Sequence, residues 1–150
     1  MAKLNIVKIG DDTLRKVCRP VEKITPRTLQ LLDDMAETMR AANGCGLAAP
    51  QVGVLRRIVV IEVEEGQLIE LINPKIVAFA GEQRAEEGCL SIPNRWGITV
   101  RPMHVTVRAL DRHGNTVEIT GSDLLARAIC HELDHLDGKL FIDNMVEEIE

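Results

Sequence analysis

Aromatic side chains are scarce in this 150-residue chain, which has one Trp, two Phe and no Tyr. Its core must therefore be built from aliphatic Leu, Ile, Val and Met side chains. The chain also lacks an excess of basic residues, because its net charge is -5 and its pI is near 5.4. A general nucleic-acid binder would carry such an excess, so we expect no DNA partner.

No apolar run in the sequence approaches the length of a membrane span, and residues 1–5 lack the apolar region of a signal peptide. We therefore expect a cytoplasmic protein without a membrane partner. In that reducing compartment, the four cysteines suit metal binding or catalysis better than disulfide bonds. Packing as small core hydrophobes is the alternative, and we expect it for Cys18 and Cys130.

The chain shows no linker, repeat or low-complexity stretch, so we expect a single domain over residues 1–150. Residues 1–24 have an irregular pattern, with weak strand character at 6–9. A helix is predicted to begin at residues 25–26, where Thr is the N-cap and Pro takes the first helical position. It is predicted to stop at residues 43–44 (Asn-Gly).

Strand-like patterns of apolar and β-branched residues occur at six places. They are residues 57–63, 68–72, 75–80, 98–100, 104–110 and 116–119. A second helix is predicted to follow Gly121, with Ser122 or Asp123 as its cap, and to end at residues 137–138. Because its interior is apolar on most sides, this helix should be buried. Together these elements predict an α+β fold, in which antiparallel β-strands pack around the central buried helix.

The predicted second helix carries the pattern HExxH, as His-Glu-Leu-Asp-His at residues 131–135. His131 and His135 would project within about 40° of each other, so that both imidazoles could reach one metal ion. Glu132 would lie about 60° from His135, beside the ion, where a general base is needed. A metal lowers the pKa of a bound water, and such a carboxylate then takes its proton. Two incidental histidines are the alternative, but buried His and Glu side chains need partners. The pattern predicts a hydrolytic metalloenzyme.

A catalytic metal needs a third protein ligand besides two histidines. His113 is expected to be solvated in a polar turn, whereas His104, in a strand, is a further candidate. The acidic residues after His135 are interpreted as a helix stop and a solvated tail; they are Asp137, Asp143, Glu147, Glu148 and Glu150. Cys89 is the better candidate, since it follows two acids and a glycine between strand-like segments, although core packing is its alternative. Two imidazoles and one thiolate suit Fe(II), Zn(II), Co(II) or Ni(II).

Three stretches together resemble the motifs of one enzyme family. Residues 44–51 (GCGLAAPQ), 87–91 (EGCLS) and 131–135 (HELDH) are similar to the three motifs of peptide deformylases, in the family's order and approximate spacing. The likeness runs over nearly the whole chain. It implies an enzyme that removes the N-terminal formyl group from formyl-methionyl nascent chains and releases formate. The implied partners are therefore N-formylmethionyl peptides.

The same resemblance assigns roles to individual residues. The implied metal ligands are Cys89, His131 and His135. The metal is usually Fe(II) in cells and is often replaced by Zn(II), Ni(II) or Co(II). Glu132 would be the general acid/base. Gln51 and the backbone N–H of Leu90 would hydrogen-bond the oxyanion that develops on the formyl oxygen, where preorganised donors can contribute several kcal/mol.

Small residues around the motifs let a substrate backbone lie close to the protein, although a tight turn is an alternative use for them. The candidates for substrate binding are Gly44, Cys45, Gly46, Gly88, Leu124 and Ala128. Cys45, Leu124 and Ala128 would line an apolar methionine pocket, with ordinary core packing as the alternative. Cys45 stands where an aliphatic residue is usual in the family, and Cys130 replaces a frequent glutamine. On a helix, Cys130 points about 140° away from His135, so it is not expected to bind the ion.

Two other functions stay open at this point. A small zinc peptidase shares the helix motif but would need a ligand downstream of His135. A structural zinc site in a binding module would need four ligands, and Glu132 would then have no function. Longer deformylases use a C-terminal helix to dock on the ribosome, whereas residues 147–150 are acidic and match RNA phosphates poorly. We therefore expect no more than a transient ribosome contact.

Overall fold

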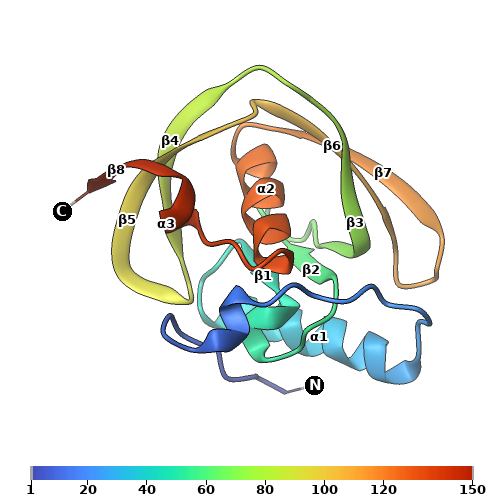
Figure 1. Cartoon of the computed structure of the whole chain (residues 1–150). Helices are drawn as coiled ribbons and strands as arrows, with labels where there is room; N and C mark the ends of the chain where they lie inside the picture. Colours follow the sequence, from blue (N-terminus) through green and yellow to red (C-terminus); the bar gives the residue numbers. More distant parts are fainter. Residues whose placement is uncertain (1, 150) are drawn as a thin grey trace.

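Helix α2 lies at the centre of the molecule, with antiparallel sheets on either side of it (Figure 1). The computed structural model describes residues 2–149. One sheet has five strands in the order β1-β2-β3-β6-β7, and the other has three in the order β4-β5-β8. The helices are η1 (Asp12–Arg15), α1 (Pro26–Ala41), η2 (Ala49–Val52), α2 (Leu124–Leu136) and α3 (Phe141–Asn144). The strands are β1 (Gly46–Ala48), β2 (Ile58–Ile61), β3 (Ile69–Ala80), β4 (Gln83–Cys89), β5 (Ile92–Arg101), β6 (His104–Leu110), β7 (Thr116–Ser122) and β8 (Met145–Ile149). This arrangement confirms the predicted α+β fold around a buried helix.

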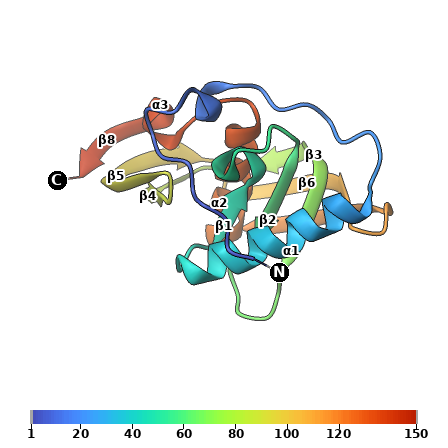
Figure 2. The same ribbon diagram turned by 90° about the horizontal axis from the view of Figure 1, so that it is seen from below.

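The five-stranded sheet is covered by a helix on each face. In β2, Val59 and Ile61 belong to the apolar cluster that contains α2, whereas Ile58 and Val60 belong to the cluster that contains α1. Successive side chains of a strand point to opposite faces, so the unbroken apolar run of β2 is buried on both sides. Figure 2 shows α1 lying against this sheet. Both clusters are aliphatic, as the scarcity of aromatic residues predicted.

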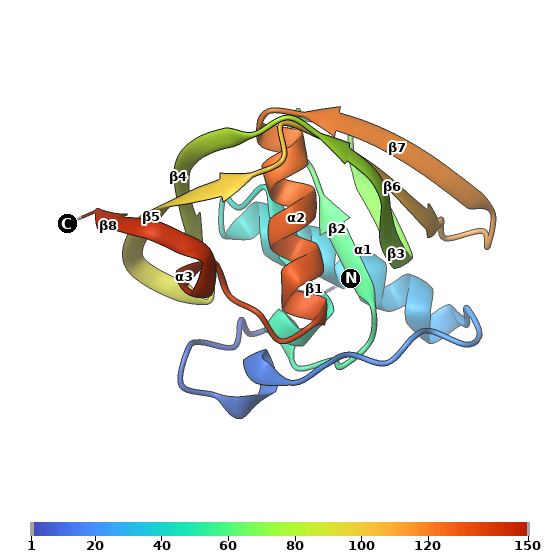
Figure 3. The same cartoon turned by 45° about the horizontal axis from the view of Figure 1, so that its top comes forward.

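Two stretches of chain pass from one sheet to the other over α2. Only residues 81–82 separate β3 from β4, and only residues 102–103 separate β5 from β6. Gly81 adopts a left-handed φ of 69°, which glycine accepts without strain, and Pro102 has no N–H to donate to a strand ladder. The strands therefore arch over the helix and continue in the other sheet (Figure 3). At the far end of this arch, the β4–β5 turn brings Cys89 towards α2.

Both predicted helices form, but one cap differs. Thr25 and Thr28 cap α1 reciprocally, because each main-chain N–H donates to the other's hydroxyl, at 3.2 and 3.4 Å. Of the two residues predicted to cap α2, Ser122 and Asp123, Asp123 is the N-cap, although its side chain makes no capping hydrogen bond. Its φ is 53° and its carbonyl accepts from the Gln83 amide, so tertiary contacts fix this helix start. Within residues 2–149, no helix is long and apolar enough to cross a membrane.

Several strands are longer than their apolar patterns predicted. The predicted segments 68–72 and 75–80 form one strand, β3, whose register shifts at residues 73–74. Strand β5 begins at Ile92 rather than at residue 98, and β1, β4 and β8 were not predicted. Strand β4 is mostly polar but pairs with β5 over its whole length. Ladder hydrogen bonds come from the main chain, so such a strand gives no apolar signal.

Glu147 and Glu148 are exposed to solvent, as predicted for a solvated tail, but they lie in strand β8, which was not predicted. Strand β8 pairs antiparallel with β5, and Glu148 makes a bidentate ion pair with Arg95, with both contacts at 2.9 Å. Most β8 side chains stay exposed. Besides its main-chain pairing, the strand is held by this ion pair, by a contact of Arg84 with Glu147 at 4.0 Å, and by Met145, which packs against an apolar cluster. Glu150 lies outside the described residues. At the other end, residues 6–9 belong to no strand, which corrects the weak strand prediction there.

Candidate metal centre and active site

Three side chains converge between α2 and the end of β4. The Sγ atom of Cys89 and one ring nitrogen each of His131 and His135 all lie within 4.8 Å of one another. The Cys89 Sγ is 3.4 Å from His135 Nε2, and the two imidazole centroids are 5.1 Å apart. His104 and His113 are both exposed and do not belong to this group. The structure thus brings together the three predicted ligands and leaves the other histidines outside.

The surroundings of this group suit a cation. His135 is 1% exposed, and burial lowers its pKa well below the usual range, so it is neutral, as a metal ligand must be. Burial by itself would also lower the pKa of His131. However, the Glu132 carboxylate and the hydrogen bonds around the ring outweigh burial and raise the pKa of His131 well above its usual value. The negative groups around His131 therefore favour a positive charge at this place, which a metal ion would supply instead of the proton. The nitrogen and sulfur donors fit a divalent transition metal.

Glu87, on β4, links His131 to a buried arginine. One Glu87 oxygen lies 2.9 Å from His131 Nδ1, and the two oxygens accept from Arg101 at 2.9 and 3.0 Å. The Thr99 hydroxyl donates to Glu87, and Arg101 also donates to Asp134 at 2.7 Å. Burial raises the pKa of Glu87, but hydrogen bonds from His131 and Arg101 outweigh it and hold this pKa well below the usual range. Glu87 is thus a carboxylate that orients His131.

This hydrogen-bond network was not predicted from the sequence. Glu87 belongs to the second motif, so its place two residues before Cys89 could have suggested a contact with the metal centre. Arg101 gives no such signal, because a single arginine at a strand end is common on protein surfaces. Arg101 is paired with Gln83 in the β4–β5 ladder, and its side chain reaches Glu87 further along β4.

Replacing Glu87 by Gln is expected to weaken metal binding about 10- to 100-fold. The amide lacks the charge that holds His131, and it leaves Arg101 buried with one carboxylate fewer. Metal affinity would be measured anaerobically by competition with a chromogenic chelator. Glu148→Gln is the matched control, because it breaks another bidentate pair, to Arg95, on the exposed part of the same sheet. Unchanged affinity in Glu87→Gln, or an equal loss in the control, would contradict this role.

Glu132 and Gln51 border the same space. Glu132 is 4% exposed, burial raises its pKa to about 7, and its Oε1 has no hydrogen-bond partner among residues 2–149. The Gln51 amide is held at both ends, because Oε1 accepts from the Ala48 N–H at 2.9 Å and Nε2 donates to the Ser91 hydroxyl at 3.1 Å. Nε2 also lies 3.6 Å from Cys89 Sγ, so its second N–H points towards the three convergent side chains.

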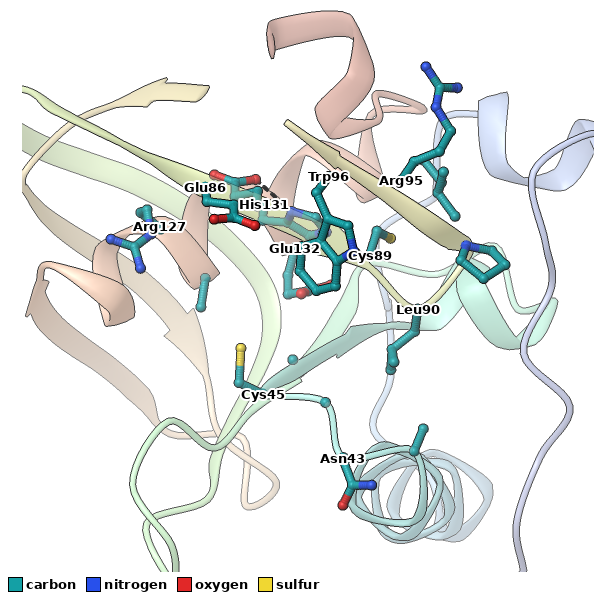
Figure 4. A pocket seen from close by; sticks show the side chains of 18 of the residues that line it. Asn43, Cys45, Glu86, Cys89, Leu90, Arg95, Trp96, Arg127, His131 and Glu132 are labelled. Carbon is teal, nitrogen blue, oxygen red and sulfur yellow. Dashed lines mark hydrogen bonds and ion pairs between the residues drawn. The ribbon is translucent and has the colours of Figure 1, made fainter. Parts of the chain in front are cut away.

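A cavity of about 520 Å³ opens beside Glu132 (Figure 4). All six residues predicted to bind substrate line it, namely Gly44, Cys45, Gly46, Gly88, Leu124 and Ala128. Gln51, Cys89, Leu90 and His131 line it too. A Cβ on Gly46 would lie 2.5 Å from Glu132 Oε2, and the Trp96 ring packs directly on Gly88. A side chain at residue 46 would collide with Glu132 and one at residue 88 with Trp96, so both positions require glycine. Trp96 and Arg127 line the cavity but were not predicted.

The other cysteines fall into the expected classes. Cys18 and Cys130 are buried in the apolar cluster around α2, and burial raises the pKa of each to about 11. This confirms their prediction as small core residues. Cys45 is exposed on the cavity wall, and partial burial, together with Glu132, raises the pKa of its thiol. Its thiol is therefore accessible but protonated at neutral pH.

The geometry agrees with a comparison against known proteins. A family model described as "Polypeptide deformylase" matches residues 3–149 of the chain. The chain belongs to the polypeptide deformylase family. As a polypeptide deformylase it is a metal-dependent hydrolase, which removes the N-terminal formyl group from formyl-methionyl nascent chains and releases formate.

Individual polypeptide deformylases resemble the chain over most of their length. The peptide deformylase of Caldanaerobacter subterraneus subsp. tengcongensis is 58% identical over 146 residues, which cover 97% of this chain and 91% of that protein. The one from Acetivibrio thermocellus is 57% identical over 150 residues, which cover 100% of this chain and 88% of that protein.

Solved structures of peptide deformylases resemble the fold of this chain. The crystal structure of a Legionella pneumophila peptide deformylase is 46% identical with a TM-score of 0.93, covering 95% of this chain and 86% of that one. A Synechococcus elongatus peptide deformylase in complex with actinonin is 40% identical with a TM-score of 0.92, covering 95% and 80%. These matches favour a deformylase over the zinc peptidase and the structural zinc module.

Proposed function

We propose that Cys89, His131 and His135 hold one divalent metal ion in this deformylase. The observation that carries this proposal is the convergence of their ligand atoms within 4.8 Å of one another, next to a cavity that Glu132 and Gln51 also line. Three ligands leave a coordination position open, as catalytic metal sites require. When bound, the metal supplies Lewis acidity, which activates the attacking water and polarises the formyl carbonyl.

The metal that we propose for the enzyme in cells is Fe(II), with Zn(II), Ni(II) and Co(II) as alternatives. One thiolate and two imidazoles accommodate all four ions, so ligand type narrows the choice without making it. An X-ray absorption spectrum of anaerobically purified protein would identify the ion. It would also test for one sulfur ligand, which we expect from Cys89.

Glu132 is proposed as the general acid/base. Its pKa of about 7, raised by burial, lets the carboxyl group both accept and donate a proton near neutral pH. Oε1 has no other partner among the described residues, so it is free to take a proton from the attacking water. The same oxygen can then protonate the amine nitrogen that leaves when the formamide bond breaks. Gly46 has no Cβ, which leaves space beside the Glu132 carboxylate for these proton transfers.

Gln51 Nε2 and the Leu90 N–H are proposed as donors to the formyl oxygen as it gains negative charge. Gln51 is neutral and is held by Ala48 and Ser91, so it needs little reorganisation during the reaction. Leu90 is the residue after Cys89, in the turn that joins β4 to β5. Both donors therefore come from segments that lie next to the proposed metal site.

The substrate-binding set is proposed to take the methionine side chain and the adjoining peptide backbone; it consists of Gly44, Cys45, Gly46, Gly88, Leu124 and Ala128. We further propose that residues 1–150 act as one catalytic domain in the cytoplasm. The proposed partners are N-formylmethionyl peptides, without a membrane or DNA partner. Ribosome contact is proposed to be transient at most, because Glu147 and Glu148 are exposed on β8 and would repel RNA phosphates.

Release of formate from a formyl-methionyl tripeptide tests this function directly. Anaerobically purified, Fe(II)-loaded protein is expected to release formate from the tripeptide and to leave casein intact, whereas a zinc peptidase would cleave casein. A chelator should abolish turnover, and added Fe(II) should restore it, because the metal supplies the Lewis acid. Fully metal-loaded protein that releases no formate would contradict the proposal.

A further inference from the structure

Residues 4–9, which we call the strap, cross two of the three sequence motifs. The Val7 N–H donates to the carbonyl of Gln51 at 2.7 Å, and the Ile9 N–H donates to the carbonyl of Ser91 at 2.8 Å. Figure 2 shows this N-terminal segment running from α1 past β1 towards β4 and β5. The strap therefore makes main-chain contacts to η2, in the first motif, and to the β4–β5 turn, in the second.

The strap is fixed at both ends. The Leu4 N–H donates to the Thr38 hydroxyl on α1 at 2.8 Å. The Val7 side chain packs against the apolar cluster that contains Ile92, as does Cys89. Lys8 Nζ lies 3.4 Å from the carbonyl of Leu90. These contacts hold the segment in one position along the two motifs.

The two proposed oxyanion donors depend on this geometry, because they come from separate parts of the chain. Gln51 lies on η2 and Leu90 lies in the β4–β5 turn. Among residues 2–149, the side-chain bond from Gln51 to Ser91 joins the two segments, but no main-chain hydrogen bond joins them directly. The strap supplies one main-chain bond to each. A donor that moves by 1 Å can cost about 10²-fold in rate, so the spacing of these segments matters for catalysis.

We propose that the strap positions Gln51 and Leu90 relative to each other, and that Val7 and Ile9 act as positioning residues through their main-chain N–H groups. This inference rests on the oxyanion roles proposed above. Neither Val7 nor Ile9 is among the residues that line the cavity. Their effect should appear in kcat, because the oxyanion forms only in the transition state.

Proline substitution tests the two N–H groups, since proline removes the donor and tolerates extended backbone. Val7→Pro and Ile9→Pro are each expected to lower kcat about 10-fold or more, with KM within about twofold and full metal content. Val7→Ala and Ile9→Ala, which keep the N–H, measure the share that is due to the side chain. Asn5→Pro is the matched control on the same segment, because Asn5 is exposed and its N–H has no partner within residues 2–149. It should keep the kcat of the parent enzyme.

A double-mutant cycle distinguishes positioning from a general loss of structure. If Val7 acts through Gln51, Val7→Pro should lower kcat less in a Gln51→Ala background than in the parent enzyme. The strap proposal is overturned if both proline variants match Asn5→Pro, if their losses follow metal content or melting temperature, or if neither variant folds. Additive effects in the cycle would overturn it too. Full kcat in Gln51→Ala would instead contradict the oxyanion role of Gln51. The Val7 and Ile9 variants do not test that role, so the two proposals can fail separately.

Discussion

Replacing Glu132 by Gln is expected to lower kcat by about 10²- to 10⁴-fold, which is the usual contribution of a positioned general acid/base. The amide has nearly the same shape as the carboxylate and fits beside Gly46, but it cannot take a proton from water. Burial raises the pKa of Glu132 to about 7, so the native carboxyl group can exchange protons at neutral pH and the amide cannot. The variant should bind metal as well as the parent enzyme, because Glu132 is not one of the three convergent side chains.

Two measurements on the Glu132 variant are needed together. Formate release gives kcat, and elemental analysis of the same sample gives the metal content. Glu86→Gln serves as the control, since Glu86 is an exposed carboxylate on the wall of the same cavity. Turnover within about tenfold of the parent would contradict the acid/base role, because that loss is well below the expected range. Loss of the metal would show that Glu132 holds the ion instead.

Cys89→Ala is expected to remove most of the bound metal and, with it, nearly all turnover. The two histidines would remain on α2, but a site with two protein ligands falls one short of the three that catalytic metals use. Metal content would be measured by mass spectrometry after anaerobic gel filtration, and formate release would be measured on the same fractions. Loss of bound metal should also lower the melting temperature, because an ion that binds only the native state stabilises it.

Cys130→Ala is the matched control for Cys89→Ala. Cys130 precedes His131 in the chain, yet its thiol lies in the apolar cluster around α2. Burial raises its pKa to about 11, so it is protonated at neutral pH and is not expected to bind a metal. The control should keep its metal and its turnover. A Cys89→Ala protein with full metal content would exclude the thiolate as a ligand, and loss of metal from the control would place Cys130 in the site.

The sequence predicted best those elements whose burial follows a regular period. Helix α2 is apolar on most sides because sheets pack around it, and α1 has apolar residues at helical spacing because it covers one face of a sheet. The His131 and His135 pair could be predicted from helix geometry alone. Cys89 was found by a different route, since two histidines are too few for a catalytic metal and the second motif offered a thiol.

The features that the sequence did not predict depend on pairing between distant segments. Strand β4 is mostly polar, so its strand conformation comes from the ladder with β5 rather than from its own pattern. Strand β8 is acidic and likewise owes its strand conformation to pairing with β5, where Glu148 also forms an ion pair with Arg95. Glu87 and Arg101 lie on neighbouring strands but are not paired in the ladder, where Glu87 is opposite Gly97 and Arg101 opposite Gln83, so their contact depends on how the two side chains reach each other in the folded protein. Single charged residues give no information about such partners until the strands are paired.

The arch of strands over α2 makes the proposed metal a cross-link between two parts of the fold. Cys89 comes from the tip of the three-stranded sheet, whereas both histidines come from the helix. An ion bound to all three would close a long loop of chain, and such closure removes conformational freedom from the unfolded state. Its binding free energy would then count towards folding. When the ion leaves, the contacts of Glu87 with His131 and of Arg101 with Asp134 would still join the three-stranded sheet to α2.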